Sequence, residues 1–174
     1  QLVDGGSDEH LWSETYDREL KNIFEIESDI ARDVAVALRQ MVTDEDIARL
    51  KKPPTRNLDA YAHYMQGRQA VVYRDEKELK AARAHFQAAT ELDPDFALAW
   101  VGLADSLEWL GGYSLLTDEE TFAPRQNAID HALAIDPALG EAWLSLAGLK
   151  SDQGEPEEAE KYFRRSIELS PENA

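Results

Sequence analysis

The chain has 174 residues, of which 18 are basic and 35 acidic, giving a formal net charge of −17. Its length favours one domain or two small ones, and its hydrophobic share of 43% argues against disorder throughout. A surface this acidic repels phosphate backbones and anionic lipids, because binding to them needs clustered lysine and arginine. Nucleic acid and membrane surfaces are therefore disfavoured as partners.

The chain contains no cysteine, which excludes disulfides and thiolate metal sites. No apolar run approaches the ~20 residues that a helix needs to cross a bilayer. The chain begins at Gln1, without an initiator methionine or a signal peptide, and it stops just after Pro171. We therefore expect a cytoplasmic piece of a larger protein.

Two short β-prone runs open the chain, at residues 1–3 and 10–13, with a strong turn signal at residues 4–8 between them. They are compatible with a hairpin that is the remnant of a β-sheet. Because two isolated strands are marginal in water, a loosely ordered tail is an equally good interpretation.

A long amphipathic helix is predicted over about residues 21–41. Its apolar residues recur at steps of three and four and form one stripe: Ile23, Ile26, Ile30, Val34, Ala37 and Met41. A short helix should follow, ending near Leu50. Two prolines at 53 and 54 then break the helical pattern, because proline lacks the amide donor and restricts its predecessor. We place the module boundary there, between residues 1–52 and 57–174.

The remainder of the chain contains a sequence motif that occurs three times. In each copy a helical run ends just before a proline, which is Pro94, Pro137 or Pro171. The last two of these prolines are 34 residues apart and the first two are 43 apart. After each of the first two stops, residues 97–104 and 140–147 repeat Ala, Trp, Leu and Ala in register. Self-similarity at a period near 34 residues indicates an array of helix-turn-helix units.

The last copy carries a family resemblance. Counted from Gly140, its residues at positions 4, 7, 15, 20, 24 and 32 are Trp143, Leu146, Gly154, Ala159, Phe163 and Pro171. In this pattern the segment resembles a tetratricopeptide repeat, and only Ala147 and Ser166 depart from it. The resemblance covers about the last two thirds of the chain. It implies an all-α fold, a right-handed superhelix of three helical hairpins at about 57–94, 95–137 and 138–171.

A second resemblance concerns residues 10–20 and 23–26, which are similar to the end of a TolB-like amino-terminal domain. In bacteria that domain often precedes tetratricopeptide repeats. Such proteins commonly carry a class III adenylate or guanylate cyclase domain, or a winged-helix DNA-binding domain, further upstream. The resemblance implies that residues 1–52 are the remnant of a TolB-like domain plus a connecting helix. None of the cyclase's catalytic segments is present, so no catalytic residue can be assigned from it.

The middle hairpin departs from the repeat pattern. Residues 111–116 replace the usual short turn, and we interpret Gly111 and Gly112 as the flexible start of this insert. Thr117 and Glu120 have the spacing of a capping box, which predicts a helix start near residue 118. Arg125 stands where the family has alanine, and the neighbouring Pro124 is expected to bend the start of the helix.

The sequence offers no catalytic constellation. The four histidines, His10, His63, His85 and His131, have no metal-ligand spacing, and we expect His85 and His131 on exposed helix flanks. Nucleophile and nucleotide-binding motifs are also missing. We therefore expect no catalytic residue, no metal and no cofactor in this part of the parent protein.

A concave groove is implied by the family resemblance, because the first helices of such hairpins line a surface that holds peptides. Aligning the repeats places ten residues there: Tyr61, Tyr64, Arg68, Leu98, Val101, Asp105, Glu108, Trp109, Leu144 and Gly148. Aromatic side chains dominate binding hot spots, so a protein or peptide partner could bind in this groove. The alternative is that the long helix near Ile30 fills it. The basic clamp with which chaperone-binding relatives hold a carboxylate is not evident.

Two further expectations concern packing. Trp100 and Trp143 occupy the same repeat position, so we expect them to be equivalent packing residues. An array usually needs a polar cap on its last repeat. Because none follows Pro171, we expect Tyr162, Ile167 and Leu169 to promote self-association.

The leading functional hypothesis is a protein–protein interaction module of a bacterial signalling protein, the C-terminal regulatory region of an adenylate or guanylate cyclase. The alternatives are a homodimerisation scaffold and the repeat region of a winged-helix transcriptional regulator.

Overall fold

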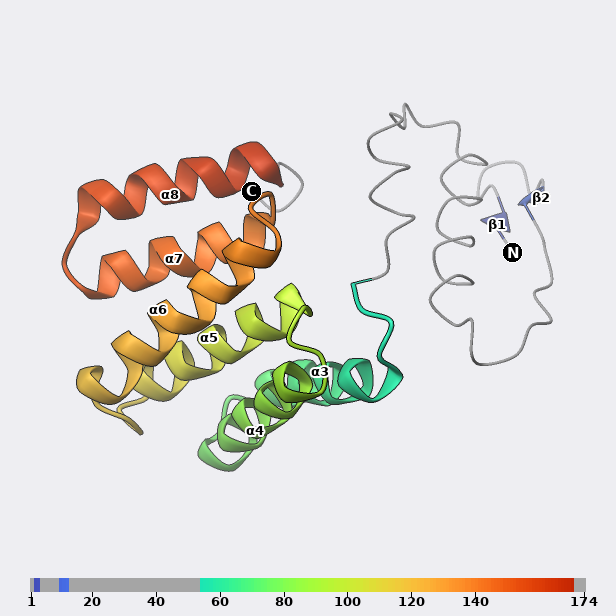
Figure 1. Ribbon diagram of the computed structural model, residues 1–174, viewed down its shortest axis with the longest axis horizontal. Coiled ribbons are helices and arrows are strands. Elements are labelled where there is room, and N and C mark those ends of the chain that lie inside the picture. Colours follow the sequence, from blue (N-terminus) through green and yellow to red (C-terminus); the bar gives the residue numbers. More distant parts are fainter. Residues whose placement is uncertain (1, 4–9, 13–53, 171–174) are drawn as a thin grey trace. The chain divides into compact units, whose positions relative to one another are not determined.

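A computed structural model describes residues 2–3, 10–12 and 54–170 of the chain (Figure 1). The chain divides into two compact units, Gln1–Arg56 and Asn57–Ala174. In the first unit, β1 (Leu2–Val3) pairs antiparallel with β2 (His10–Trp12). Of the two interpretations that the sequence left open, the pairing of these strands is thus the one that the structure shows. The helices predicted over about 21–41 and up to residue 50 lie outside the described residues.

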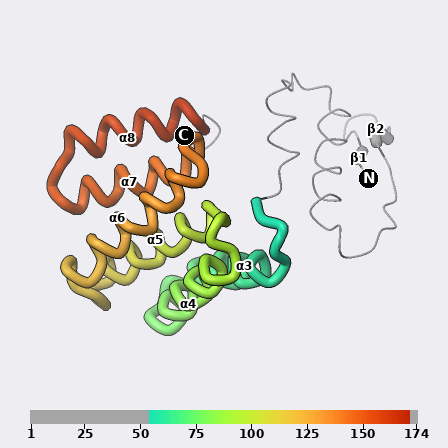
Figure 2. The backbone as a smooth tube through the Cα atoms, viewed as in Figure 1, coloured from blue at the N-terminus to red at the C-terminus, as the bar shows by residue number. Residues whose placement is uncertain are grey.

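The second unit is all-α. Its described residues form helices that succeed one another in antiparallel pairs, and Figure 2 shows the pairs following each other along the chain from green to red. The helices are α3 (Leu58–Val71), α4 (Glu76–Leu92), α5 (Ala97–Gly112), α6 (Asp118–Ile135), α7 (Gly140–Asp152) and α8 (Pro156–Leu169). This arrangement is the predicted helical-repeat fold.

The helices begin where side chains can satisfy their first amide groups. Asn57 accepts hydrogen bonds from two backbone amides at the start of α3, and Asp75 accepts one from Glu78 at the start of α4. Thr117 and Glu120 form the predicted capping box at the start of α6. Each such cap stabilises its helix by about 1 kcal/mol.

The ends of α4 and α6 show the structural role of the repeated motif that precedes each proline. Asp93 and Asp136, each directly before a proline, close α4 and α6 with nearly identical backbone angles (φ −142°, ψ 93° and φ −137°, ψ 93°). A following proline excludes the helical conformation from its predecessor, so the chain leaves the helix at the same angle each time. The same local sequence therefore produces the same connection between successive hairpins.

Trp100 and Trp143 make the same indole hydrogen bond, although the ring of Trp100 stacks on His131 and that of Trp143 contacts Tyr162. The indole Nε1 of Trp100 donates to the carbonyl of Pro94 at 2.8 Å, and that of Trp143 donates to the carbonyl of Pro137 at 2.9 Å. Both side chains are half-buried against the same apolar cluster, which contains Leu146. The prediction that these segments are structural copies is confirmed. Because neither indole is fully buried, truncation should cost less than for a core aromatic residue.

The hairpins stack through a large side chain that lies eight residues before each closing proline. Phe86 and Ile129, which hold this position in α4 and α6, are almost completely buried. A Cβ atom added to Gly67 of α3 would lie 2.8 Å from the Phe86 ring, and one added to Gly102 of α5 would also overlap the ring. These glycines therefore let both neighbouring helices approach the same aromatic side chain.

The middle hairpin differs from the expectation in one respect. Gly111 and Gly112 are the last two residues of α5, and the turn to α6 begins only at Tyr113. The interpretation of the glycine pair as a flexible start of the insert is therefore wrong. A Cβ atom on Gly111 would lie 3.3 Å from Cγ2 of Thr121, so a close approach of α6 explains this glycine. The helix α6 itself continues through Pro124.

Candidate functional site: a groove along α3, α5 and α7

A groove of about 700 Å³ lies along the first helices of the three hairpins. Nine of the ten residues that the sequence places there line it: Tyr64, Arg68, Leu98, Val101, Asp105, Glu108, Trp109, Leu144 and Gly148. The structure adds Gly102, Glu141, Ser145 and Phe163 to the lining. Tyr61 is not part of it and packs instead against the apolar core of the first hairpin.

The sequence spacing of α5 explains why this helix supplies most of the lining. Leu98, Val101, Asp105 and Glu108 follow one another at steps of three and four, which places them on one face of a helix. On α7 the lining residues Glu141, Leu144, Ser145 and Gly148 lie on one face of the helix for the same reason. The groove is therefore a direct result of helical periodicity, and its predominantly apolar wall with a few charges is typical of binding sites.

Asp105 is the charged group whose environment is most altered. Its carboxylate accepts a hydrogen bond of 2.5 Å from the hydroxyl of Ser145, which joins α5 to α7. The pKa of Asp105 is raised to about 6, chiefly by burial and to a smaller extent by the neighbouring Glu108 carboxylate, whereas the Ser145 hydrogen bond and the charges of Arg125 and Arg68 oppose the shift. The ionised form of Asp105 is thus incompletely compensated by its surroundings.

Arg68 is the exposed cation of the groove. One of its guanidinium nitrogens donates to the hydroxyl of Tyr64 at 3.0 Å. This hydrogen bond, together with the fields of Asp105 and Glu141, raises the pKa of Arg68 above its usual range. Arg68 therefore stays charged, with its guanidinium held against the Tyr64 hydroxyl.

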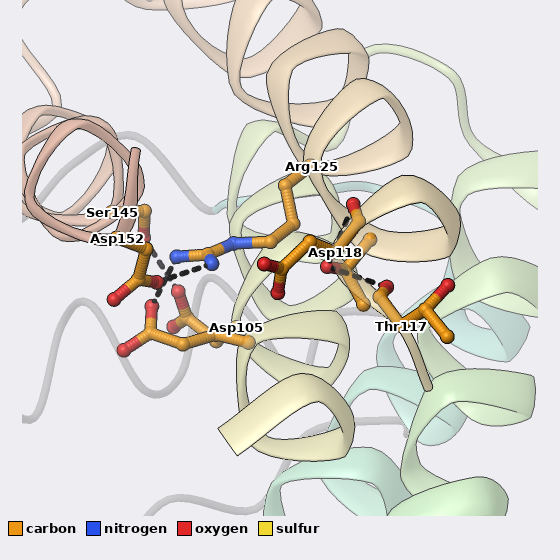
Figure 3. A network of polar contacts seen from close by, with 8 residues as sticks. Asp105, Thr117, Asp118, Arg125, Ser145 and Asp152 are labelled. Atoms are coloured by element: carbon orange, nitrogen blue, oxygen red, sulfur yellow. Dashed lines mark hydrogen bonds and ion pairs between the residues drawn. The ribbon is translucent and has the colours of Figure 1, made fainter. Parts of the chain in front are cut away.

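Beneath the groove, a buried arginine connects three helices. Arg125 of α6, which is 2% exposed, donates to Glu108 of α5 at 2.8 Å and to Asp152 of α7 at 2.6 Å. Figure 3 shows its side chain extending from α6 toward Asp152 and toward the side of α5 that carries Asp105. Arg125 thereby fixes the spacing of the two helices that form most of the groove.

The position of Arg125 in the repeat explains why it is unusual. Twelve residues before the closing proline, the other two hairpins carry the small buried residues Ala82 and Ala159. The acceptor of this guanidinium finds room because α7 has Gly148 opposite, where an added Cβ atom would lie 3.2 Å from a Glu108 carboxylate oxygen. The sequence showed the anomaly at Arg125 but not its partners, which lie on two other helices.

Trp109 forms one rim of the groove, and its ring is already in contact with a cation. The guanidinium carbon of Arg74 lies 4.3 Å from the centre of the Trp109 ring. Arg74 adopts a left-handed backbone conformation, with φ 53°, in the turn between α3 and α4. The contact joins the first and second hairpins at this rim and is worth about 1 kcal/mol. Nothing in the local sequence indicated it.

The histidines make contacts that sequence reasoning missed. The Nδ1 atoms of His63 and His85 are 3.1 Å apart, and His85 is half-buried rather than on an exposed flank. The pair lies beside the contact between the rings of Tyr64 and Phe86, each of which directly follows one of the two histidines. His131 is exposed as expected, and its ring stacks on that of Trp100 at 4.4 Å.

Neither a metal site nor a membrane span is found among the described residues. In residues 2–3, 10–12 and 54–170, no group of three or more His, Cys, Asp or Glu side chains is arranged to hold a metal ion. Over the same ranges, every helix is too short or too polar to span a lipid bilayer.

Comparison with known proteins identifies the kind of repeat. The family model named tetratricopeptide repeat matches residues 63–96 and 140–173, which include most of the first and last hairpins. Together with the helical hairpins, these matches show that the second unit contains tetratricopeptide repeats and has their all-α fold. The middle hairpin lies between the two matched segments, and there Arg125 and the longer turn depart from the pattern.

One relative is a protein of Rhizobium meliloti (strain 1021) with the name "Putative adenylate cyclase 3". It is 31% identical over 104 residues, which are 60% of this chain and 18% of that protein. The chain thus spans about a fifth of the length of the curated relative that it matches. The TolB-like resemblance of the first residues stays a prediction.

Proposed function

We propose that this chain is a protein-interaction module of a bacterial signalling protein, and that it binds a peptide segment of its partner in the groove along α3, α5 and α7. The single observation that carries the proposal is the groove itself, with apolar walls and a few convergent charges. Repeat arrays of this kind use such extended concave surfaces for recognition.

The parent protein is proposed to be a cytoplasmic adenylate or guanylate cyclase, in which this region is regulatory and non-catalytic. Support comes from the name of the Rhizobium meliloti relative, whose match covers 60% of this chain. The domain assignment goes with it: residues 1–52 as a TolB-like remnant with a connecting helix, and 57–174 as three repeats. A winged-helix regulator is the alternative parent, and the sequence upstream of Gln1 would distinguish the two.

Peptide display tests the binding function. Peptides selected on the full chain should bind Leu144→Ala about tenfold more weakly than the wild type, because Leu144 lines the groove and is 48% exposed. Met65→Ala is the matched control, since Met65 is also 48% exposed but lies outside the groove. Selected peptides that bind both variants as tightly as the wild type would contradict the proposal, as would a failure to select any.

A specific observation favours a second function, homodimerisation through α7 and α8. Phe163 holds the same repeat position as the buried Phe86 and Ile129, yet it is 39% exposed, and the nearby Ile167 is 49% exposed. A stacking surface that is covered in the other hairpins is thus open in this one. Sedimentation of the full chain over a range of concentrations tests this function. A dimer that Ile167→Glu converts to a monomer supports it, and a strict monomer contradicts it.

A further inference from the structure

The charges that line the groove are unevenly balanced. They belong to Arg68, Asp105, Glu108 and Glu141. Glu108 is already paired with the buried Arg125. The groove therefore presents one guanidinium against the two carboxylates of Asp105 and Glu141, within a chain whose net charge is −17.

We infer that the groove selects a basic, apolar peptide segment, in which lysine or arginine side chains reach Asp105 and Glu141 and an apolar side chain packs on Leu144 and Phe163. This inference rests on the proposed function and names the chemistry of its partner. It also excludes acidic segments and free C-terminal carboxylates from the same place, because like charges in an interface are strongly unfavourable.

Asp105 provides the polar anchor. Within the described residues it receives a hydrogen bond from Ser145 but forms no ion pair. Burial has raised its pKa, which means that its negative charge is poorly solvated. A ligand ammonium or guanidinium group would supply the missing opposite charge without a further loss of water from the carboxylate.

The apolar anchor lies at the α7 end of the groove. Leu144 is 48% exposed and Phe163 39% exposed, and both line the groove. An apolar side chain of the ligand would cover surface that is now in water, which is the usual arrangement of a binding hot spot beside a polar rim. The ligand therefore needs both kinds of residue, and a purely basic chain lacks the second contact.

The cations already present do not satisfy this site. The guanidinium of Arg68 is engaged with Tyr64 at 3.0 Å, and that of Arg125 with Glu108 and Asp152. Both act on Asp105 only through space. The carboxylates of Asp105 and Glu141 are thus available to pair with a positively charged group of a partner.

The probes for the experiment are three labelled peptides with leucine at the same positions. All the other positions are lysine in the first peptide, glutamine in the second and glutamate in the third. Binding to the full chain is measured by fluorescence anisotropy at physiological ionic strength. We expect the lysine peptide to bind at least about tenfold more tightly than the glutamine peptide, and the glutamate peptide to bind more weakly than either.

The variants locate the preference in the groove. Asp105→Asn and Glu141→Gln should each weaken the lysine peptide about tenfold while leaving the glutamine peptide unchanged. Asparagine can still accept the Ser145 hydrogen bond, so Asp105→Asn keeps the local geometry. The matched controls are Asp130→Asn and Glu119→Gln on α6, which remove the same charges from exposed positions outside the groove. Neither control should alter binding.

Each result decides the question. Equal binding of the lysine and glutamine peptides, both weakened by Leu144→Ala, would overturn the charge preference and leave the proposed function intact. Equal losses in the groove variants and the α6 controls would reduce the preference to general attraction by an acidic chain and would also overturn it. If none of the three peptides binds while display-selected peptides do, the inference is wrong and the proposed function is retained.

Discussion

Arg125 on α6 and Asp152 on α7 are 27 residues apart in the chain, yet a hydrogen bond of 2.6 Å joins their side chains. The same guanidinium reaches Glu108 on α5. Because Arg125 is buried whereas both carboxylates are partly exposed, removal of the arginine leaves a cavity and two repelling acids that water can partly solvate.

We predict that Arg125→Ala lowers the free energy of unfolding by about 3 kcal/mol, and that Arg125→Met lowers it by about 1 kcal/mol because methionine fills the space. Urea denaturation measures both. Arg164→Ala is the control, since the Arg164–Glu160 pair has the same 2.6 Å separation but is exposed, and its loss should cost under about 0.5 kcal/mol. Similar costs for Arg125→Ala and Arg164→Ala would contradict a structural role for the buried pair.

Trp100 and Trp143 should respond alike to substitution. Trp100→Phe and Trp143→Phe each remove one indole hydrogen bond to a proline carbonyl, so each should cost about 1–2 kcal/mol in urea denaturation. The two costs should agree within about 0.5 kcal/mol, because each substitution removes the same indole hydrogen bond and keeps an aromatic ring in place. A variant that unfolds like the wild type, beside one that loses several kcal/mol, would show that the two repeats do not share this interaction.

Phe86 and Phe163 should respond differently, although they hold the same repeat position. Phe86 is 1% exposed and Phe163 is 39% exposed. Truncation to alanine should therefore cost about 4 kcal/mol at Phe86 and about 1 kcal/mol at Phe163. Denaturation at low protein concentration measures this difference. A cost at Phe163 as large as that at Phe86 would mean that some element covers α8 in solution.

The pH dependence of stability should report on Asp105. Its pKa is about 6 in the folded chain, against 3.8 for the model carboxyl group, so the folded state holds the proton more tightly than the unfolded state. The stabilising contribution of its protonated form is present at pH 4 and is lost as the pH rises through 6. Arg68, Glu108, Arg125 and Ser145 face this carboxylate and set its environment.

Asp105→Asn should therefore be more stable than the wild type above pH 7, by on the order of 2 kcal/mol, and this advantage should shrink as the pH falls toward 5. Unfolding free energies of both proteins at a series of pH values give the difference directly, which removes the contribution of the other carboxylates. A difference in unfolding free energy that stays constant across the series would contradict a raised pKa for Asp105 in the folded chain.

The repeats could be predicted because their signals are local. Proline after Asp93 or Asp136 ends a helix whatever lies around it, and the tryptophan six residues after the proline returns to that proline's carbonyl. The groove residues followed from the same register, since helical spacing fixes which side chains share a face.

The remainder depended on contacts between hairpins. The partners of Arg125 lie on α5 and α7, and the Arg74 guanidinium that covers Trp109 comes from a turn. Tyr61 lies outside the lining of the groove because it packs against the core of the first hairpin. Gly111 was misread because glycine signals a turn by default, whereas here it lies within α5 and close to Thr121 of the next helix.

The three-helix attachment of Arg125 has a consequence for how this array can be divided. In an ideal solenoid each hairpin contacts only its nearest neighbours, so removing the last hairpin removes only one interface. Here a truncation after Pro137 would delete Asp152 and expose the buried guanidinium of Arg125 at the new surface, with Glu108 as its remaining hydrogen-bond acceptor. The middle and last hairpins therefore form one indivisible block, and deletion, duplication or grafting should keep them together.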